Sequence, residues 1–294
     1  MRYISKTFRF AQISIVLAVA LAGCYSNNEP RKKTETIYVT LPPIAYLVRE
    51  IAGPGYKVKT LFSDNQNPHT FEPQIKQIKE ISQSDIFFVA GLPEEQAFEK
   101  HFKGKKYPVV MNVSENITKM HMGCSKCAGC SGLDPHTWMT PDNLSKQAVV
   151  IFSALVMTYP EDKRTFKIRL DTLMKKLDAL DKSVRAKLAP CKGDTFFVYH
   201  PSFGYFAKQY NLKQIAIEKD GKKPSIKHLE DVIKIGQKLK NKVVIAQPQF
   251  LKKYPEMIAR EIGAKVYAVN PLGEDPTETI SKLADIIAGS YSEN

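Results

Sequence analysis

The stretch PEDKRTFKIRLDTLMKKLDALDKSVRAKLAP occupies residues 160–190, between two halves of the chain. Proline followed by two acidic residues is typical of a helix start. Apolar residues then recur at spacings of three or four, at Phe166, Leu170, Leu173, Leu177, Leu180, Val184 and Leu188. The pattern predicts one long helix over about 161–188, roughly 42 Å in length at 1.5 Å per residue. A rod of this length would connect the two halves stiffly.

On either side of this stretch, short apolar runs alternate with amphipathic runs. The first half predicts strands at 37–39, 58–62, 86–89 and 109–113, with helices at 44–51, 74–82 and 93–102. The second half predicts strands at 196–199, 214–217, 243–246 and 266–269, with helices at 203–210, 226–239, 251–262 and 277–290. Such alternation is typical of mostly parallel sheets covered by helices. We therefore expect an α/β protein with two lobes, residues 35–142 and 191–294, joined by a segment at 143–190.

The start of the chain indicates where the protein works. A basic head is followed by an apolar run at 10–20, which is too short to span a bilayer as a stop-transfer helix. Leu21-Ala22-Gly23-Cys24 resembles a bacterial lipobox. We expect a signal peptide at 1–23, a lipid on Cys24 and a tether at 24–34, which make an extracytoplasmic, membrane-anchored lipoprotein. An ordinary signal peptide with a chance cysteine is the alternative.

The chain is basic, with a formal net charge of +13. The lysines are spread along predicted helical faces and no basic-aromatic motif occurs, so we expect no nucleic-acid partner. The charge instead indicates a solvated surface with affinity for anionic lipid. The chain also has no His-Glu-x-x-His pair and no Gly-x-Ser-x-Gly motif, and we do not expect an enzyme.

Three of the six histidines lie in turns beside apolar runs, at His69, His136 and His200. In open α/β sheets ligands bind beyond the carboxyl ends of the strands, and His69 and His200 follow predicted strands. Three histidines from separate segments are a usual protein share of an open zinc site. A turn or strand-end role is the alternative for each histidine. His101 and His228 lie on amphipathic stretches, where we expect them to face solvent.

An ordered set of segments resembles the metal-binding receptors of bacterial zinc and manganese ABC importers, the cluster A-I solute-binding proteins. The segments are Asn67-Pro68-His69-Thr70-Phe71-Glu72-Pro73, Ser84-Asp85-Ile86-Phe87-Phe88-Val89-Ala90-Gly91, Asp134-Pro135-His136-Thr137-Trp138, His200-Pro201-Ser202-Phe203-Gly204-Tyr205-Phe206, Gln247-Pro248-Gln249-Phe250 and, more weakly, Asn270-Pro271-Leu272-Gly273. The resemblance implies two lobes joined by a rigid helix, with the metal in the cleft between them.

The resemblance also implies the ligands, with His69 and His136 from the first lobe and His200 from the second. The family takes a fourth ligand from a carboxylate near the segment before Pro271, or from water. This chain has Asn270 there, with Glu274 and Asp275 nearby. Around the site, we expect Gly204 and Tyr205 to shape the cleft and Trp138 to pack beside the first-lobe ligand.

Three histidines without an obvious carboxylate favour Zn2+ over Mn2+ or Fe2+, because the latter suit oxygen-rich sites. We expect a monomeric receptor that captures Zn2+ as its transported ligand and delivers it to an ABC importer permease. The alternatives are a manganese or iron receptor and a metal-dependent surface adhesin. A zinc hydrolase and a copper-binding or redox protein are less favoured.

A cysteine-rich loop at 120–131 precedes the second histidine motif. It contains His121, Cys124, Cys127 and Cys130, at C-x2-C-x2-C spacing, and one more cysteine, Cys191, follows much later. Thiolates are soft ligands that suit zinc or cuprous copper, which favours an auxiliary metal-capture site. The alternative is disulfide formation among the four cysteines outside the cytosol, with three possible pairings.

Overall fold

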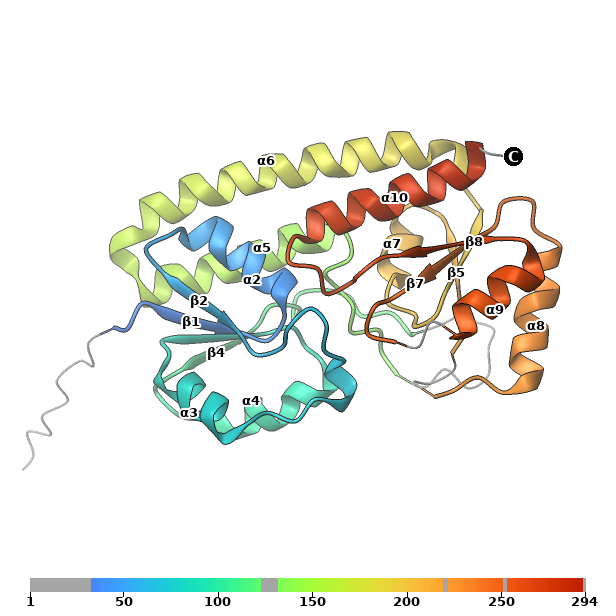
Figure 1. The fold of residues 1–294 in the computed structure, drawn as a ribbon. Coiled ribbons are helices and arrows are strands. Elements are labelled where there is room, and N and C mark those ends of the chain that lie inside the picture. The colour runs from blue at the N-terminus through green and yellow to red at the C-terminus, as the bar shows by residue number, and fades with distance from the viewer. Residues whose placement is uncertain (1–32, 123–131, 219–221, 251–252, 293–294) are drawn as a thin grey trace, which may run out of the picture. The chain divides into compact units, whose positions relative to one another are not determined.

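The computed structural model describes residues 33–122, 132–218, 222–250 and 253–292. The chain divides into a unit Met1–Lys33 and a unit Thr34–Asn294, and the fold is that of the second unit (Figure 1). The predicted signal peptide and Cys24, the predicted lipid attachment site, lie outside the described residues. Among the residues that are described, no helix is both long and apolar enough to cross a membrane.

The first lobe is built on a four-stranded parallel sheet. Its strands are β1 (Thr36–Val39), β2 (Lys57–Thr60), β3 (Ile86–Val89) and β4 (Val109–Asn112), in the order β2-β1-β3-β4. All four residues of β3 are buried, as expected for an apolar strand inside a parallel sheet that has helices on both faces. The helices are α2 (Pro42–Ala52), α3 (Ile75–Gln83) and α4 (Gln96–Phe102), with short 3-10 turns at Pro68–Thr70 and Pro93–Glu95.

The second lobe repeats this plan. Its strands are β5 (Thr195–Val198), β6 (Lys213–Ala216), β7 (Val243–Ala246) and β8 (Lys265–Ala268), parallel and in the equivalent order β6-β5-β7-β8. Its helices are α7 (Gly204–Gln209), α8 (Ile226–Gln237), α9 (Lys253–Ile262) and α10 (Pro276–Ser292). The predicted α/β class with two mostly parallel sheets is therefore confirmed.

The long helix is confirmed as α6 (Lys163–Leu188), between 3-10 turns at Pro160–Asp162 and Ala189–Cys191. Its 26 residues span roughly 39 Å. The apolar stripe is buried at Phe166, Leu170, Leu173, Leu177, Val184 and Leu188. Figure 1 shows α6 running alongside α10 of the second lobe, and it also packs against α2 and α5.

Helix α5 (Pro141–Thr158) was not recognised in the sequence, which was expected to hold a single helix between the lobes. It begins where the Thr140 side chain accepts a hydrogen bond from the Asn143 amide at 3.2 Å, a typical N-cap. Most of its residues are apolar or small, and Val149 and Met157 remain exposed on its outer face. Apolar residues on several faces weaken the 3.6-residue period, which explains why the pattern gave no signal.

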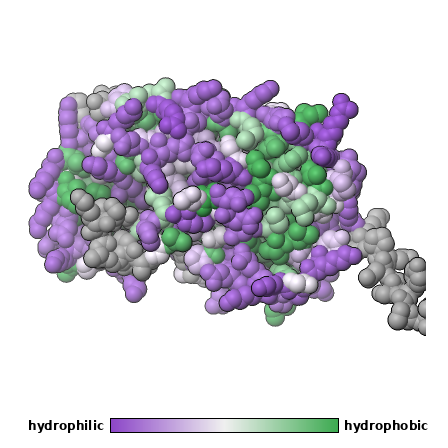
Figure 2. Space-filling model, turned by 180° about the vertical axis from the view of Figure 1, so that it is seen from behind, coloured by the Kyte–Doolittle hydropathy of each residue, from purple (hydrophilic) through white to green (hydrophobic). Residues whose placement is uncertain are grey.

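One hydrophobic core extends through both lobes. Alternate residues of β5 point to opposite faces of its sheet, so that Phe196 and Val198 enter this shared core while Phe197 packs against α8 and α9. The shared core also contains the buried residues of β3, α5, α6 and α10. Figure 2 shows the face of the molecule that lies behind the view of Figure 1, which is mostly hydrophilic with one hydrophobic area. Because the lobes share a core, we expect them to unfold together.

Replacing the fully buried Phe166 by alanine should destabilise the whole protein. We expect a loss of about 3–5 kcal/mol in the free energy of unfolding, with a single transition for both lobes. Urea unfolding followed by Trp138 fluorescence and by far-UV circular dichroism would measure it. Alanine at Ile168, which is 60% exposed on the same helix, is the control, with a change within about 0.5 kcal/mol. Two separate transitions in the wild type would contradict the shared core.

Candidate metal centre

His136 is held in one orientation by Asp134, two residues before it. The Asp134 Oδ1 accepts hydrogen bonds from the His136 backbone N–H at 2.9 Å and from its Nδ1 at 2.8 Å. Both side chains are buried, with 1% and 5% exposure for Asp134 and His136. Because a carboxylate accepts the Nδ1 hydrogen, the neutral ring presents a lone pair at Nε2.

His200 is held in the same way by a residue that sequence reasoning missed. Its Nδ1 lies 2.6 Å from Oε1 of Glu218, which is 4% exposed. His200 comes two residues after β5 and Glu218 two residues after the adjacent strand β6. The signal in the sequence that could have identified Glu218 is its position, a polar residue just after a strand that neighbours the strand of His200. Gln247 fixes the backbone, since its Oε1 accepts from His200 N and its Nε2 donates to His200 O.

The Nε2 atoms of the two histidines lie 3.3 Å apart. With both Nδ1 hydrogens given to carboxylates, two lone pairs face each other, which is unfavourable unless a cation or a proton lies near them. Two nitrogens bound to a tetrahedral zinc at about 2.0–2.1 Å would be about 3.3–3.4 Å apart. The spacing and the tautomers therefore suit a shared metal ion. A carboxylate behind each ligating histidine is also the usual outer partner in metal sites.

A cavity of about 20 Å³ adjoins this pair, which is room for one small occupant. Asn67 and Pro68 line it, and these residues immediately precede His69 in the 3-10 turn Pro68–Thr70. The His69 side chain is outside the described part of the structure, and no cluster of three potential ligands is found among the described side chains. Ligation by His69 therefore stays a prediction.

The proposed fourth ligands make other contacts. Asn270 Oδ1 accepts from Leu272 N at 2.9 Å and from Gln249 Nε2 at 2.5 Å, and its Nδ2 donates to Asp64 O at 3.2 Å. Asp275 Oδ1 accepts from the backbone and hydroxyl of Thr277 at the start of α10. Glu274 is exposed. These contacts give Asn270 and Asp275 structural roles, and the identity of the fourth ligand stays a prediction.

Residues of the second lobe contact Asp134, the residue that orients His136. Tyr205 Oη donates to Asp134 O at 3.0 Å, and burial raises the pKa of this tyrosine to about 12, so it remains a donor. A side chain at Gly204 would lie 2.6 Å from Asp134 Oδ2. The prediction that these two residues shape the cleft agrees with these contacts. Trp138 packs its ring 5.5 Å from that of His136, as predicted, and donates to Pro271 O at 2.7 Å.

A buried carboxylate, Glu95, holds the backbone segment that carries one of the residues lining the cavity. Glu95 accepts hydrogen bonds from the backbone N–H groups of Ala90, Gly91 and Leu92, and Leu92 lines the small cavity. Burial raises the pKa of Glu95 to about 7, although these hydrogen bonds oppose the rise. Burial has the opposite effect on a lysine: it lowers the pKa of Lys119, although the negative charges of Asp134 and Glu95 act to raise it.

Cys124, Cys127 and Cys130 lie outside the described residues. The two ends of their loop are described and pair as antiparallel backbone: Met122 N donates to Gly132 O, Asp134 N donates to Met120 O, and His121 bridges Leu133. The loop therefore closes immediately before Asp134. Cys191 is a free thiol, 1% exposed within the shared core, and burial raises its pKa.

The two remaining histidines differ from each other. His101 is exposed, as expected. The expectation for His228 was wrong, because its side chain is half-buried and its Nε2 donates to Ala216 O at 3.1 Å. This bond ties α8 to the end of β6, and it gives His228 a structural role away from the metal centre.

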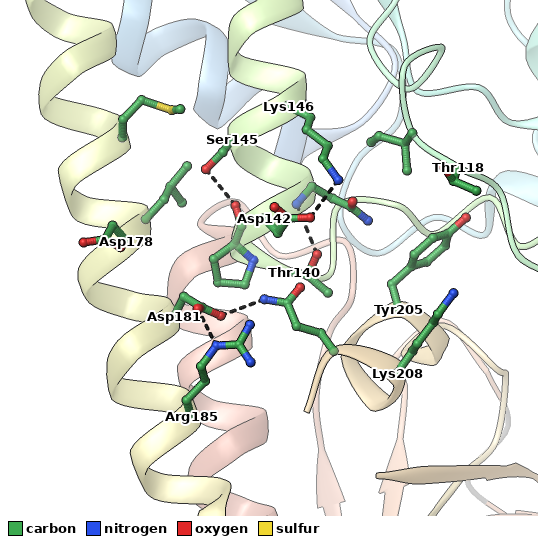
Figure 3. Close-up of a pocket in the computed structure, with 16 residues that line it drawn as sticks. Thr118, Thr140, Asp142, Ser145, Lys146, Asp178, Asp181, Arg185, Tyr205 and Lys208 are labelled. Atoms are coloured by element: carbon green, nitrogen blue, oxygen red, sulfur yellow. Dashed lines mark hydrogen bonds and ion pairs between the residues drawn. The ribbon is translucent and has the colours of Figure 1, made fainter. Parts of the chain in front are cut away.

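A larger hollow of about 750 Å³ lies between α5, α6 and α7 (Figure 3). Two of the charge pairs that Figure 3 labels are Asp142 with Lys146 at 2.8 Å and Asp181 with Arg185 at 2.6 Å, and Asp178 pairs with Lys182 at 2.6 Å. Asp181 also accepts from Gln209 at 2.7 Å. Paired surface charges of this kind offer no evident metal site, and the small cavity at the histidines is the better candidate.

The chain is similar to known metal-binding proteins. A family model described as the periplasmic zinc-uptake complex component A, ZnuA, matches residues 37–290. The chain is 27% identical over 277 residues to a candidate metal-binding protein of Chlamydia trachomatis serovar D, covering 93% of this chain and 97% of that one. It is 27% identical over 290 residues to the zinc-binding lipoprotein AdcA of Streptococcus pneumoniae serotype 4, covering 93% of this chain and 58% of AdcA.

The fold is similar to a crystal structure of ZnuA, with a TM-score of 0.79 and 30% identity, over 86% of this chain and 98% of that one. The family match begins in β1 and ends in α10, so it includes all three histidine motifs and both lobes. This chain therefore belongs to the family of periplasmic zinc-uptake component A proteins, the zinc-type solute-binding proteins of cluster A-I.

Proposed function

We propose that the protein captures one Zn2+ ion between His136 and His200, outside the cytoplasm, and delivers it to the permease of an ABC importer. The observation that carries this proposal is the pair of Nε2 atoms 3.3 Å apart, each on a ring whose Nδ1 faces a buried carboxylate. His69 is proposed as the third ligand, because its turn follows residues that line the same cavity.

The described chemistry favours binding over catalysis. A zinc hydrolase needs a general base beside the metal-bound water. Asp134 and Glu218 are the buried carboxylates that contact the histidines, and both are occupied in bonds to Nδ1. Their role is therefore to orient the rings and raise their basicity. Imidazole nitrogens also suit zinc better than manganese, which prefers oxygen-rich surroundings.

The proposed location depends on the N-terminal segment. The lipobox-like sequence places a lipid on Cys24, ten residues before Thr34, where the folded unit begins. A relative of this chain, AdcA, is named a lipoprotein. An anchored monomer on the outer face of a membrane would stay close to the permease that accepts its metal.

Metal content after competition tests this function. The mature protein, stripped and exposed to equimolar zinc, manganese, iron and copper, should retain about one zinc per chain by mass spectrometry. Alanine at His69, His136 or His200 should abolish this, because each removes a proposed ligand. Alanine at the exposed His101 is the matched control and should have no effect. Manganese in the same site would contradict the choice of zinc, and copper held without these histidines would contradict the site.

The carboxylates behind the histidines should affect affinity without being ligands. Asp134→Asn and Glu218→Gln should each weaken zinc binding about 10–100-fold, since the amide makes the ring a poorer donor to the metal. Titration against a chromophoric chelator would measure the change. Glu80→Gln, at a carboxylate paired with Lys59 instead, is the control and should bind as the wild type does. Equal affinity in all four proteins would show that these contacts do not tune the metal.

The cysteine loop is proposed to capture metal for the cleft. Cys191 is a free thiol buried in the core, so it is not available to pair with the three loop cysteines. Three cysteines can form at most one disulfide among themselves. Freshly purified protein with the proposed lipid on Cys24 should therefore show three reactive thiols when native and a fourth on unfolding. Zinc should protect the three. A single reactive thiol in the native protein would instead support a disulfide in the loop.

A further inference from the structure

Gln249 lies three residues after β7 and lines the same small cavity as His136 and His200. Its Nε2 donates two hydrogen bonds of 2.5 Å, one to the backbone O of Asp64 and one to Oδ1 of Asn270. Asp64 belongs to the first lobe, in the loop that leads to His69. The amide of Gln249 therefore spans the cleft from the second lobe to the loop of a proposed ligand.

These two acceptors fix which way the Gln249 amide points. A backbone carbonyl can only accept, so the nitrogen of Gln249 must face Asp64 O. Asn270 is oriented independently, because its Oδ1 accepts from Leu272 N at 2.9 Å and its Nδ2 donates to Asp64 O. Turning the Gln249 amide would set its oxygen against two other oxygens. Its own Oε1 must consequently point the other way.

That oxygen is buried and has no hydrogen-bond partner within the described part of the protein. A buried carbonyl oxygen without a donor is costly, on the order of 1–3 kcal/mol, and such groups normally mark a site that water or an ion completes. The adjoining space of about 20 Å³ can hold one water molecule beside an ion bound between the two Nε2 atoms. Gln249 thus offers an acceptor oxygen at the cavity that His136 and His200 also line.

We propose that Gln249 Oε1 accepts a hydrogen bond from the water that fills the fourth coordination position of the bound Zn2+. This inference rests on the proposed metal site. Three histidines and a water complete a tetrahedral zinc, and an acceptor in the protein holds that water in place. Gln249 is then a positioning residue, whose nitrogen holds the His69 loop and whose oxygen holds the water.

Substitutions at Gln249 separate the oxygen from the nitrogen. Gln249→Met removes both the acceptor and the donor, whereas Gln249→Glu removes the donor but keeps an oxygen. We expect zinc affinity to fall on the order of tenfold in Gln249→Met and to equal or exceed the wild type in Gln249→Glu. The metal-free melting temperature should fall in both variants, which lose the bonds to Asp64 and Asn270, and further in Gln249→Glu, whose second oxygen would face the oxygens of both residues.

A control variant and a spectrum complete the test. Gln209→Met changes a glutamine that bonds to Asp181 instead. It should keep affinity within about threefold of the wild type. With Co2+ in place of zinc, Gln249→Met should alter the visible absorption bands, which report the coordination sphere, while Gln209→Met should not.

The outcomes distinguish this inference from the proposed function. Equal losses in Gln249→Met and Gln249→Glu, or unchanged affinity and Co2+ spectrum in Gln249→Met, would overturn the role of the oxygen while the metal site stands. If the wild type binds no zinc, or binds it independently of His136 and His200, the proposed function itself fails.

Discussion

The approach of two imidazole Nε2 atoms to 3.3 Å is the constraint on which the candidate metal centre depends. Each ring is turned to this position by a buried carboxylate, Asp134 in one lobe and Glu218 in the other. Without a cation the arrangement brings electron-rich atoms together, and with a cation the same arrangement becomes favourable. The protein therefore maintains, through buried bonds, a geometry whose stability depends on what it binds.

The fold holds this geometry because the two lobes share one core, with His200 just after the carboxyl end of β5 and His136 in the segment just before α5. The α6 helix and α10 pack along each other, so the lobes cannot separate without exposing apolar side chains. Contacts across the cleft are also short and buried, as between Tyr205 and Asp134 or Trp138 and Pro271. A stiff connection of this kind allows small adjustments at the site more readily than a wide opening.

Two amide side chains, Asn270 and Gln249, occupy the region before Pro271 where the resemblance implied a carboxylate ligand. Asn270 holds the loop of Asp64 and receives Gln249, and neither contact needs a charge. A neutral wall leaves the imidazoles as the main donors, which suits zinc. Beside them, the two ends of the cysteine loop pair through backbone hydrogen bonds next to Asp134, which orients His136.

The sequence by itself determined the local structure: the strands, the long α6 helix and the histidine motifs were all visible as patterns along the chain. It did not reveal α5, because a helix apolar on several faces has little periodicity. It also could not show that His228 bonds to Ala216, Glu218 to His200 or Gln249 to Asp64. These roles belong to pairs of residues far apart in sequence, and a polar residue in a loop looks the same whether its partner is water or a buried ring. Only the tertiary structure decides that, because burial and orientation arise when the two sheets bring their strand ends together.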